Sequence, residues 1–216
     1  MTPDLSLKEH MMMAFATPVA VYPWPDSDAL NRELREIILA AERKNAGVTR
    51  SNVGGWHSGF DFFERDESCV RVLEERIMEM SGAVLRETTV ARSGAARTFD
   101  CRLAGWANVS RHGHYNSVHN HPNSLWSGTY YVSAGQPDPE TPTNGRFELL
   151  DPRTGANMVR MADTIVQPRY LIAPKPGLMM MFPSFVNHFV HPFFGSGERI
   201  SIAFVMHGAE SSHAAD

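Results

Sequence analysis

The spacing of apolar residues changes near Thr98, and this change constrains the fold more than any other feature of the sequence. Before it, apolar side chains recur every three or four positions in two stretches, which predicts two amphipathic helices. The first begins after Asp26 or Ser27, either of which can cap it, and ends before residues 45–47; the second covers residues 67–86. After Thr98 come short β-like runs separated by Gly, Pro and Asn, the pattern of a sandwich or barrel.

The expected strands share an apolar or alternating pattern bounded by turn residues. They cover residues 17–22 before the helices and 100–109, 127–133, 145–150, 167–172, 178–182, 188–192 and 199–207 after them. We therefore expect an α+β, mainly β chain that forms a single domain over residues 1–216. In it, residues 1–98 supply a strand and supporting helices, and residues 99–210 form the β core that carries the functional site.

Composition and charge indicate which classes of molecule this chain can bind. With 43% hydrophobic and 20% charged residues, the chain has enough apolar surface for one core. Its 20 basic and 24 acidic side chains give a net charge of −4, too balanced to indicate binding to nucleic acid or to an acidic membrane. We expect the substrate to be a small molecule or a protein side chain.

Location and assembly are less constrained. Cys69 and Cys101 match no metal or redox spacing, so we expect reduced thiols in a cytoplasmic protein. The apolar stretch at residues 11–22 is too short to cross a bilayer, which takes roughly 20 apolar residues. A homodimer is compatible with the exposed sheet edges of such a fold, although the sequence leaves the oligomeric state open.

Four of the ten histidines fall within ten positions, at His112, His114, His119 and His121. In an extended strand, residues i and i+2 face the same side, so His119 and His121 can offer two imidazoles to one metal ion. The earlier pair has the same spacing, and geometry does not exclude it. We prefer the later pair because it directly precedes the expected strand at residues 127–133, although one such pair alone more often forms ordinary hydrogen bonds.

A third histidine and an arginine far along the chain make metal binding by His119 and His121 the better interpretation. His188 follows the apolar run at residues 178–182 and its loop, so it can return to the same mouth of a sandwich. Arg199 shares one face of the next strand with Ser201. An unpaired buried guanidinium would cost about 3–5 kcal/mol, so Arg199 needs an anionic partner on that face. A carboxylate, with the Ser201 hydroxyl as a second donor, fits this need; the plainer alternative is an ion pair with Glu198.

Five phrases of the sequence form an ordered set. They are Ser51-Asn52-x-Gly54-Gly55-Trp56-His57-Ser58, His119-x-His121-Pro122-Asn123, Ser127-Gly128-x-Tyr130-Tyr131, Gly177-Leu178 with Phe182-Pro183 and His188, and Glu198-Arg199-Ile200-Ser201. Together they resemble a bacterial branch of the Fe(II)/2-oxoglutarate-dependent dioxygenase superfamily. The resemblance implies a double-stranded β-helix, a jelly-roll or cupin-like barrel, with the N-terminal helices packed on one sheet.

The same resemblance implies an activity and its cofactors. Fe(II), 2-oxoglutarate and molecular oxygen would together oxidise a substrate that the sequence does not identify, while 2-oxoglutarate loses carbon dioxide to give succinate. The implied metal ligands and catalytic residues are His119, His121 and His188. The implied co-substrate ligands are Arg199, Ser201, Asn108 and one of the tyrosines at 130 and 131, with Tyr131 preferred, since alternation lets only one of the two face inward.

One residue departs from the superfamily pattern. The usual ligands are two histidines and one carboxylate, whereas His121 stands where Asp or Glu is expected, which leaves the site one more positive charge. Either the branch uses three histidines, or His121 is not a ligand. Two alternatives stay open: a three-histidine iron dioxygenase that ignores 2-oxoglutarate and binds its substrate's carboxylate at Arg199, and a non-catalytic metal-binding β-sandwich. We expect the loops at residues 135–144 and 153–165 to frame the entrance.

Overall fold

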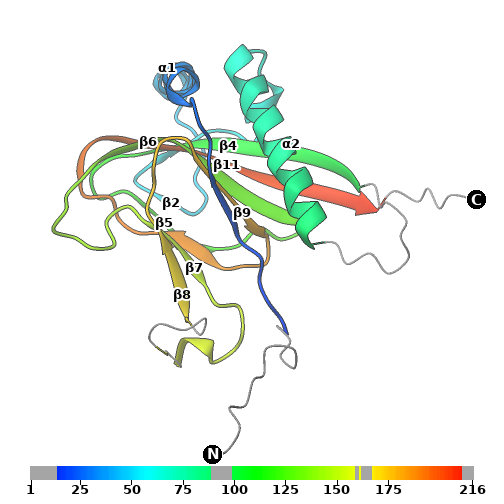
Figure 1. Ribbon diagram of the computed structural model, residues 1–216. Helices are drawn as coiled ribbons and strands as arrows, with labels where there is room; N and C mark the ends of the chain where they lie inside the picture. The colour runs from blue at the N-terminus through cyan, green and yellow to red at the C-terminus, as the bar shows by residue number, and fades with distance from the viewer. Residues whose placement is uncertain (1–13, 89–98, 159–160, 162–166, 211–216) are drawn as a thin grey trace, which may run out of the picture.

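The computed structural model describes residues 14–88, 99–158, 161 and 167–210. Two antiparallel sheets face each other, with α1 and α2 lying across the outer side of the larger sheet (Figure 1). The strand order is β1-β9-β6-β11-β4-β3 in the larger sheet and β2-β5-β10-β7-β8 in the smaller one. This arrangement confirms the expected mainly β, double-stranded β-helix class with helices on one sheet.

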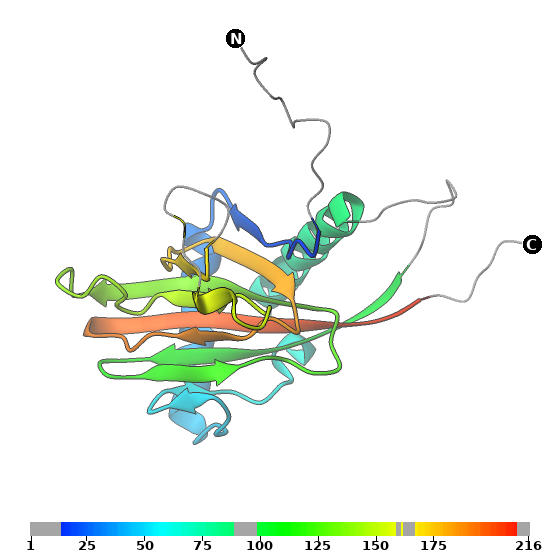
Figure 2. The same ribbon diagram turned by 90° about the horizontal axis from the view of Figure 1, so that it is seen from below.

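The strands of the larger sheet include the longest elements of the β core, which run side by side in Figure 2. They are β1 (Ala20–Pro23), β3 (Trp56–His57), β4 (Phe99–Ser110), β6 (Trp126–Pro137), β9 (Leu178–Pro183) and β11 (Gly195–Glu210). The strands of the smaller sheet are shorter: β2 (Asn52–Val53), β5 (Tyr115–His119), β7 (Phe147–Leu150), β8 (Arg169–Ile172) and β10 (His188–Val190). Short 3-10 turns occur at Phe62–Glu64 and Ala156–Met158.

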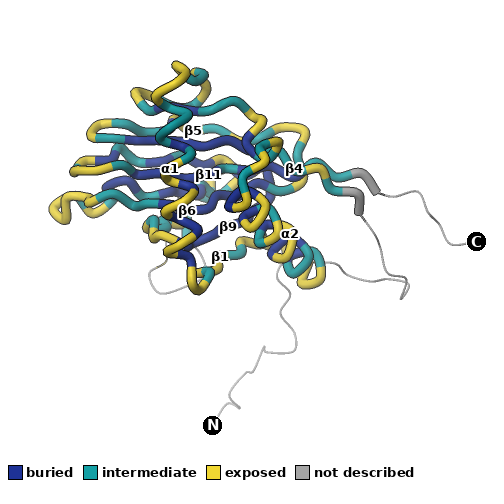
Figure 3. Tube along the Cα trace, turned by 90° about the horizontal axis from the view of Figure 1, so that it is seen from above, coloured by how far each residue is buried: buried dark blue, intermediate teal, exposed yellow. Residues whose placement is uncertain are grey.

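The two helices form where the apolar spacing predicts them. Helix α1 (Asp28–Lys44) follows Ser27 as its N-cap and buries Leu30, Leu34 and Ile38, which lie one turn apart on one face. Helix α2 (Ser68–Thr88) buries a similar stripe made of Cys69, Val70, Leu73, Ile77, Met80, Ser81 and Val84. Both stripes pack on the larger sheet, so the helices cover one side of it while their outer faces stay exposed (Figure 3).

Strand alternation divides the larger sheet into two chemically different faces. Along β11, Ile200, Ile202 and Phe204 belong to the core cluster beneath the helices. The intervening residues Arg199 and Ser201 therefore point to the opposite side, toward the smaller sheet. The helix-facing side is apolar, whereas the inter-sheet side also carries buried polar groups.

Three short strands were not predicted, and their sequences explain why. Strands β2 and β3 have only two residues each, too few to show a period. Strand β5 buries only the polar Asn116 and leaves Val118 55% exposed, so it lacks apolar alternation. Strand β5 ends at His119, so His121 lies just beyond it and the two residues do not share one strand.

The other strand limits agree with the prediction to within a few residues, except at the ends of the long strands. Strands β6 and β11 extend beyond residues 127–133 and 199–207 because their backbone pairing continues through polar residues, where the apolar pattern ends. No helix of the described residues is long and apolar enough to span a bilayer. The single domain over residues 1–216 and the homodimer stay predictions.

Two glycine substitutions test this packing. A Cβ added at Gly128 would lie 2.4 Å from the Met180 carbonyl oxygen and 2.2 Å from the Phe204 ring, so Gly128→Ala is expected to lower the free energy of unfolding by about 1–3 kcal/mol or more. At Gly82, within α2, the nearest atom is the flexible end of Arg86 at 3.4 Å, so Gly82→Ala is expected to raise it by about 0.5–1 kcal/mol. Urea unfolding measures both; a Gly128→Ala protein as stable as the parent would contradict the close packing of β6.

Candidate functional site

Two histidines from distant parts of the chain lie opposite each other in the smaller sheet. Strand β10 pairs with β5 so that His188 is the direct partner of His119, and their ring centroids are 4.3 Å apart. Cross-strand partners have Cβ atoms about 4.5–5.5 Å apart and point to the same face, which explains the contact. The His188 ring is further held by a stack on Phe147 and an edge contact with Phe182.

His121 completes the group from the loop after β5. Its backbone N–H donates to the Ser184 carbonyl over 3.1 Å, which ties this loop to the turn before β10. The chain then reverses at Asn123, which adopts a φ of 64°, a conformation that Asn tolerates better than most residues. One ring nitrogen from each of His119, His121 and His188 lies within 4.8 Å of the others. The three predicted metal ligands therefore converge.

Two of these rings have a defined tautomer. Nδ1 of His119 lies 2.7 Å from the Ser117 carbonyl oxygen, and Nδ1 of His188 lies 2.9 Å from that of Val186. Because a carbonyl oxygen only accepts, each Nδ1 carries the hydrogen, and each Nε2 keeps a lone pair that can bind a ligand, although the Ser51 hydroxyl lies 3.3 Å from Nε2 of His119. Metal-binding histidines in proteins are commonly oriented by such a bond from the other nitrogen.

Burial keeps all three imidazoles neutral. It lowers the pKa of His121 to about 4 and that of His188 to about 3, and it also lowers the pKa of His119. Neighbouring histidines lower the values of His121 and His188 further, since each would repel a second charge. Near neutral pH, each ring therefore presents an uncharged nitrogen donor, the form that binds a divalent cation.

Arg199 lies on the inter-sheet face of the larger sheet and is only 2% exposed. Its Nε–H donates to the Gly145 carbonyl over 3.0 Å, and its guanidinium lies 5.2 Å from the centre of the Tyr131 ring. Among the described residues, no carboxylate lies within 4.0 Å of it. The suggested alternative partner, Glu198, pairs instead with Arg35 and Arg111. Burial lowers the pKa of Arg199, yet an arginine side chain keeps its charge in proteins.

The other predicted co-substrate residues surround Arg199. Ser201 is the register partner of both Asn108 on β4 and Tyr131 on β6, and all three are buried. Asn108 Oδ1 has no hydrogen-bond partner in the described part of the chain. Tyr131, whose phenol pKa is raised by burial, belongs to the inter-sheet cluster, whereas Tyr130 faces the helices and donates to Asn31 Oδ1 over 2.8 Å. Of the two tyrosines, the inward one is thus Tyr131.

Three other histidines lie outside the converging group. Nδ1 of His112 accepts from Gly195 N–H, far along the chain, and Nδ1 of His114 accepts from the nearby Arg111 N–H, so each ring of this earlier pair bonds to the backbone. His191 lies on the other face of the smaller sheet, where Nε2 is 2.7 Å from the buried carboxylate of Glu148. The preference for the later His-x-His pair agrees with this geometry.

A pocket of about 480 Å³ opens beside the histidines. Its lining residues are Arg50, Ser51, His57, Phe60, Trp106, Ser117, His119, Asn120 and His121. The described parts of the expected entrance loops, residues 135–144 and 153–158, do not line it, and residues 159–160 and 162–166 fall outside the described part of the chain. Sequence reasoning missed Arg50 and Phe60, although the neighbouring phrase at residues 51–58 carried part of the resemblance.

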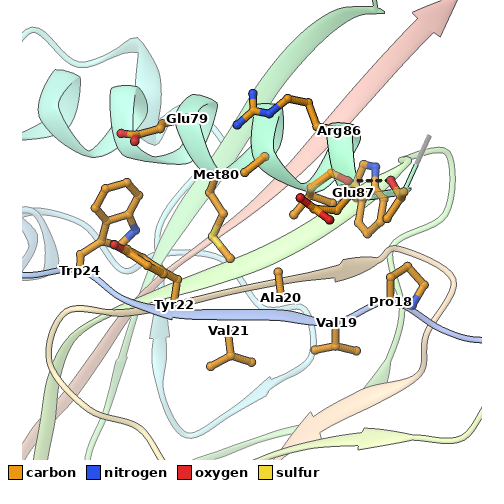
Figure 4. Close-up of a pocket in the computed structure, with 14 residues that line it drawn as sticks. Pro18, Val19, Ala20, Val21, Tyr22, Trp24, Glu79, Met80, Arg86 and Glu87 are labelled. Carbon is orange, nitrogen blue, oxygen red and sulfur yellow. Dashed lines mark hydrogen bonds between the residues drawn. The ribbon is translucent and has the colours of Figure 1, made fainter. Parts of the chain in front are cut away.

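A second and larger pocket, of about 590 Å³, lies on the helix side of the larger sheet, between β1 and α2. Figure 4 shows Met80 of α2 above this strand, with Tyr22 and Trp24 at one end of the hollow. Its lining includes Glu79, Arg86 and Glu87 but no histidine. Size alone would favour this hollow, but the convergent donors lie at the smaller pocket, which we take as the candidate site.

Comparison with known proteins agrees with the expected fold. Residues 104–205 match a family model described as "Putative 2OG-Fe(II) oxygenase". No curated protein matches the chain in sequence. The match spans the strands from β4 to β11, including all three histidines and Arg199.

Solved structures with low sequence identity share the fold. The epimerase SnoN from nogalamycin biosynthesis, described as non-heme and alpha-ketoglutarate dependent, has a TM-score of 0.62 at 11% identity over 92% of this chain and 84% of that chain. A prolyl-4-hydroxylase from Pseudomonas putida has a TM-score of 0.57 at 14% identity over 88% and 91%. HygX from Streptomyces hygroscopicus, solved with nickel and 2-oxoglutarate bound, has a TM-score of 0.57 at 12% identity over 88% and 83%. The family match covers residues 104–205, somewhat less than half of the chain, and these solved structures share its double-stranded β-helix fold.

Proposed function

We propose that this protein is an Fe(II)- and 2-oxoglutarate-dependent dioxygenase that oxidises an organic substrate while 2-oxoglutarate is converted to succinate and carbon dioxide. The observation that carries the proposal is the convergence of three neutral imidazoles in a fold that also buries an arginine without a carboxylate partner among the described residues. Bound iron would supply the activation of molecular oxygen, which protein side chains alone do not provide.

His119, His121 and His188 would hold the metal. Imidazole nitrogens suit iron, and three protein ligands leave positions open for a co-substrate and oxygen. Ser117 and Val186 carbonyls orient two of the rings, so part of the cost of ordering these ligands is already met by the fold. The donor set therefore fits a divalent transition metal.

Arg199 would bind the distal carboxylate of 2-oxoglutarate. A guanidinium that already donates through Nε to Gly145 still has both terminal NH₂ groups for a carboxylate, the strongest class of hydrogen bond available to it. Ser201 offers a hydroxyl beside it, and the Tyr131 phenol lies next to the guanidinium, with the Met180 sulfur 3.8 Å from its hydroxyl. The Asn108 amide, with its unpartnered oxygen, would reorient toward the ligand so that its NH₂ group donates.

A second candidate follows from His121 itself. Three neutral ligands leave both charges of a divalent ion uncompensated, unlike two histidines with one carboxylate. A three-histidine dioxygenase would bind its organic substrate directly and use Arg199 for that substrate's carboxylate. Oxygen uptake that is unchanged when 2-oxoglutarate is omitted would favour this candidate; strict dependence on 2-oxoglutarate with release of succinate would reject it. Absence of turnover with firmly retained zinc would favour a non-catalytic metal-binding protein.

Removing the guanidinium is expected to remove co-substrate binding. Arg199→Gln should weaken 2-oxoglutarate binding to anaerobic Fe(II)-loaded protein by about 100-fold or more, since losing a buried charge pair costs roughly 3–5 kcal/mol. The visible metal-to-ligand charge-transfer band of the complex measures this binding. Arg71→Gln, on the exposed face of α2, is the matched control and should leave the band unchanged. An unaltered band in Arg199→Gln would exclude Arg199 as the carboxylate ligand.

Metal binding should depend on the buried histidine of β10. Zn(II) is expected to raise the Tm of the parent protein, whereas His188→Gln should bind it more than about 100-fold more weakly, beyond the 10–100-fold typical of losing an outer-shell partner. The exposed His112→Gln serves as the control because it lies outside the converging group. Equal thermal shifts in all three proteins would show that the metal binds elsewhere.

The low pKa of His121 predicts acid sensitivity of the metal-free protein. Because the pKa of His121 is about 4 in the folded protein and its ordinary value is 6.5, the unfolded chain binds more protons between these pH values, and stability falls as pH falls through that window. The slope contributed by this group is up to about 1.4 kcal/mol per pH unit. His121→Gln should therefore lose less stability than the parent between pH 6.5 and 4 in urea unfolding; parallel curves would contradict this assignment.

A further inference from the structure

We propose that the 480 Å³ pocket beside the histidines binds a small organic acid, with the acid's carboxylate at Arg50 and its flat apolar part against Phe60 and Trp106. The inference deepens the proposed function, because it rests on that function for the statement that this ligand is the compound oxidised. The binding itself depends only on residues that line the pocket.

The position of the pocket makes it suitable for a substrate. His119 and His121 form part of its wall, so any occupant lies directly beside the proposed metal ligands. Its volume falls within the range of small-molecule sites, about 300–1,000 Å³. Arg199 does not line it, which leaves the co-substrate residues separate from the substrate residues.

The charge of the lining favours an anion. Its nine residues include one arginine and neither aspartate nor glutamate. The Arg50 side chain is exposed and donates from NH1 to the Thr49 carbonyl; no carboxylate in the described part of the chain lies within 4.0 Å of its guanidinium. Its remaining donors can thus bind a ligand. A cationic ligand would be repelled by Arg50 and by a metal held by three neutral rings.

An aromatic surface lies next to this cation. The rings of His57 and Trp106 stack at 5.5 Å with an interplanar angle of 9°, and Phe60 meets Trp106 edge-on at 5.2 Å. Phe60 is 46% exposed, and Arg50 lies 5.6 Å above its ring. Burial lowers the pKa of His57, with Arg50 acting in the same direction, so this surface is uncharged near neutral pH. Flat apolar groups pack well on such rings, in offset or edge-on geometry.

Polar groups between the aromatic surface and the histidines complete the recognition. Ser51 Oγ lies 3.3 Å from Nε2 of His119, and Ser117 and Asn120 also line the pocket. A ligand anchored by its carboxylate at Arg50 and by its flat part at Phe60 would extend toward these groups. The lining therefore suits a compound that is acidic at one end and apolar beside it.

Three probes of the same shape test the charge preference. We would titrate 3-phenylpropanoate, 3-phenylpropanamide and 3-phenylpropan-1-amine into Zn(II)-loaded protein by calorimetry, with and without saturating 2-oxoglutarate. The acid is expected to bind about tenfold more tightly than the amide, as one charge-assisted hydrogen bond allows, and the amine more weakly than both. An amine that binds as tightly as the acid overturns the proposal.

Single substitutions test which residues contact the bound acid. Arg50→Gln should weaken acid binding about tenfold and leave amide binding unchanged, Phe60→Ala should weaken both by severalfold, and the distant Arg71→Gln should change neither. If Arg199→Gln loses the acid while Arg50→Gln keeps it, the acid occupies the co-substrate site and the proposal fails. It also fails if metal removal abolishes binding while Arg50→Gln has no effect.

The two proposals fail in different experiments. Loss of the proposed function appears as absent 2-oxoglutarate binding, whereas Arg50-dependent binding of the acid without 2-oxoglutarate would still support the pocket assignment. The same groups occur on a free acid and at the carboxyl end of a peptide. Titration of Ala-Ala-Phe with a free carboxylate therefore identifies the source: tighter binding than 3-phenylpropanoate indicates a peptide end, and weaker binding a free acid.

Discussion

The register between β5 and β10 is the constraint on which the candidate site depends. It sets His119 directly opposite His188, although the two residues are far apart along the chain. A slip of one residue would turn one ring to the other face of the sheet and separate the donors. The register is supported on both sides of β10, because His188 also pairs with Leu149 of β7 and stacks on Phe147 of the same strand. His121 needs no strand of its own, since a backbone hydrogen bond to Ser184 holds its loop.

The two faces of the larger sheet have different roles: one packs against the helices, and the other carries the polar residues of the candidate site. The helix-facing side is covered by the apolar stripes of α1 and α2, which bury most of its hydrophobic core. The inter-sheet side carries a buried guanidinium together with Ser201, Asn108 and Tyr131. Such polar burial is costly without a partner, and an unpaired charge is the costliest case. The cost becomes understandable if an anion binds there, which is the basis of the co-substrate proposal.

Charge also connects the proposed metal site to the pocket beside it. Neutral imidazoles leave the charge of a divalent ion uncompensated, and the pocket lining adds one arginine and no acid. An anionic co-substrate and an anionic substrate would both reduce this imbalance. In the proposed metal site, His121 in place of the usual carboxylate would change more than the type of ligand, because it would alter the electrostatic preference of the whole cavity.

Sequence patterns by themselves determined the helices, the long strands of the β core and the residue types of the site. Helical spacing and strand alternation depend on local order along the chain, so they can be read without coordinates. Histidines 119, 121 and 188 and Arg199 could be named as candidates because their order along the chain resembles that of the superfamily, while their roles as ligands stay proposals. Tertiary structure decided which tyrosine faces inward, how His121 joins the group from beyond the end of β5, and that Arg50 and Phe60 border the histidines. These relations join segments far apart in sequence through strand register and loop packing, and no local pattern along the chain encodes such distances.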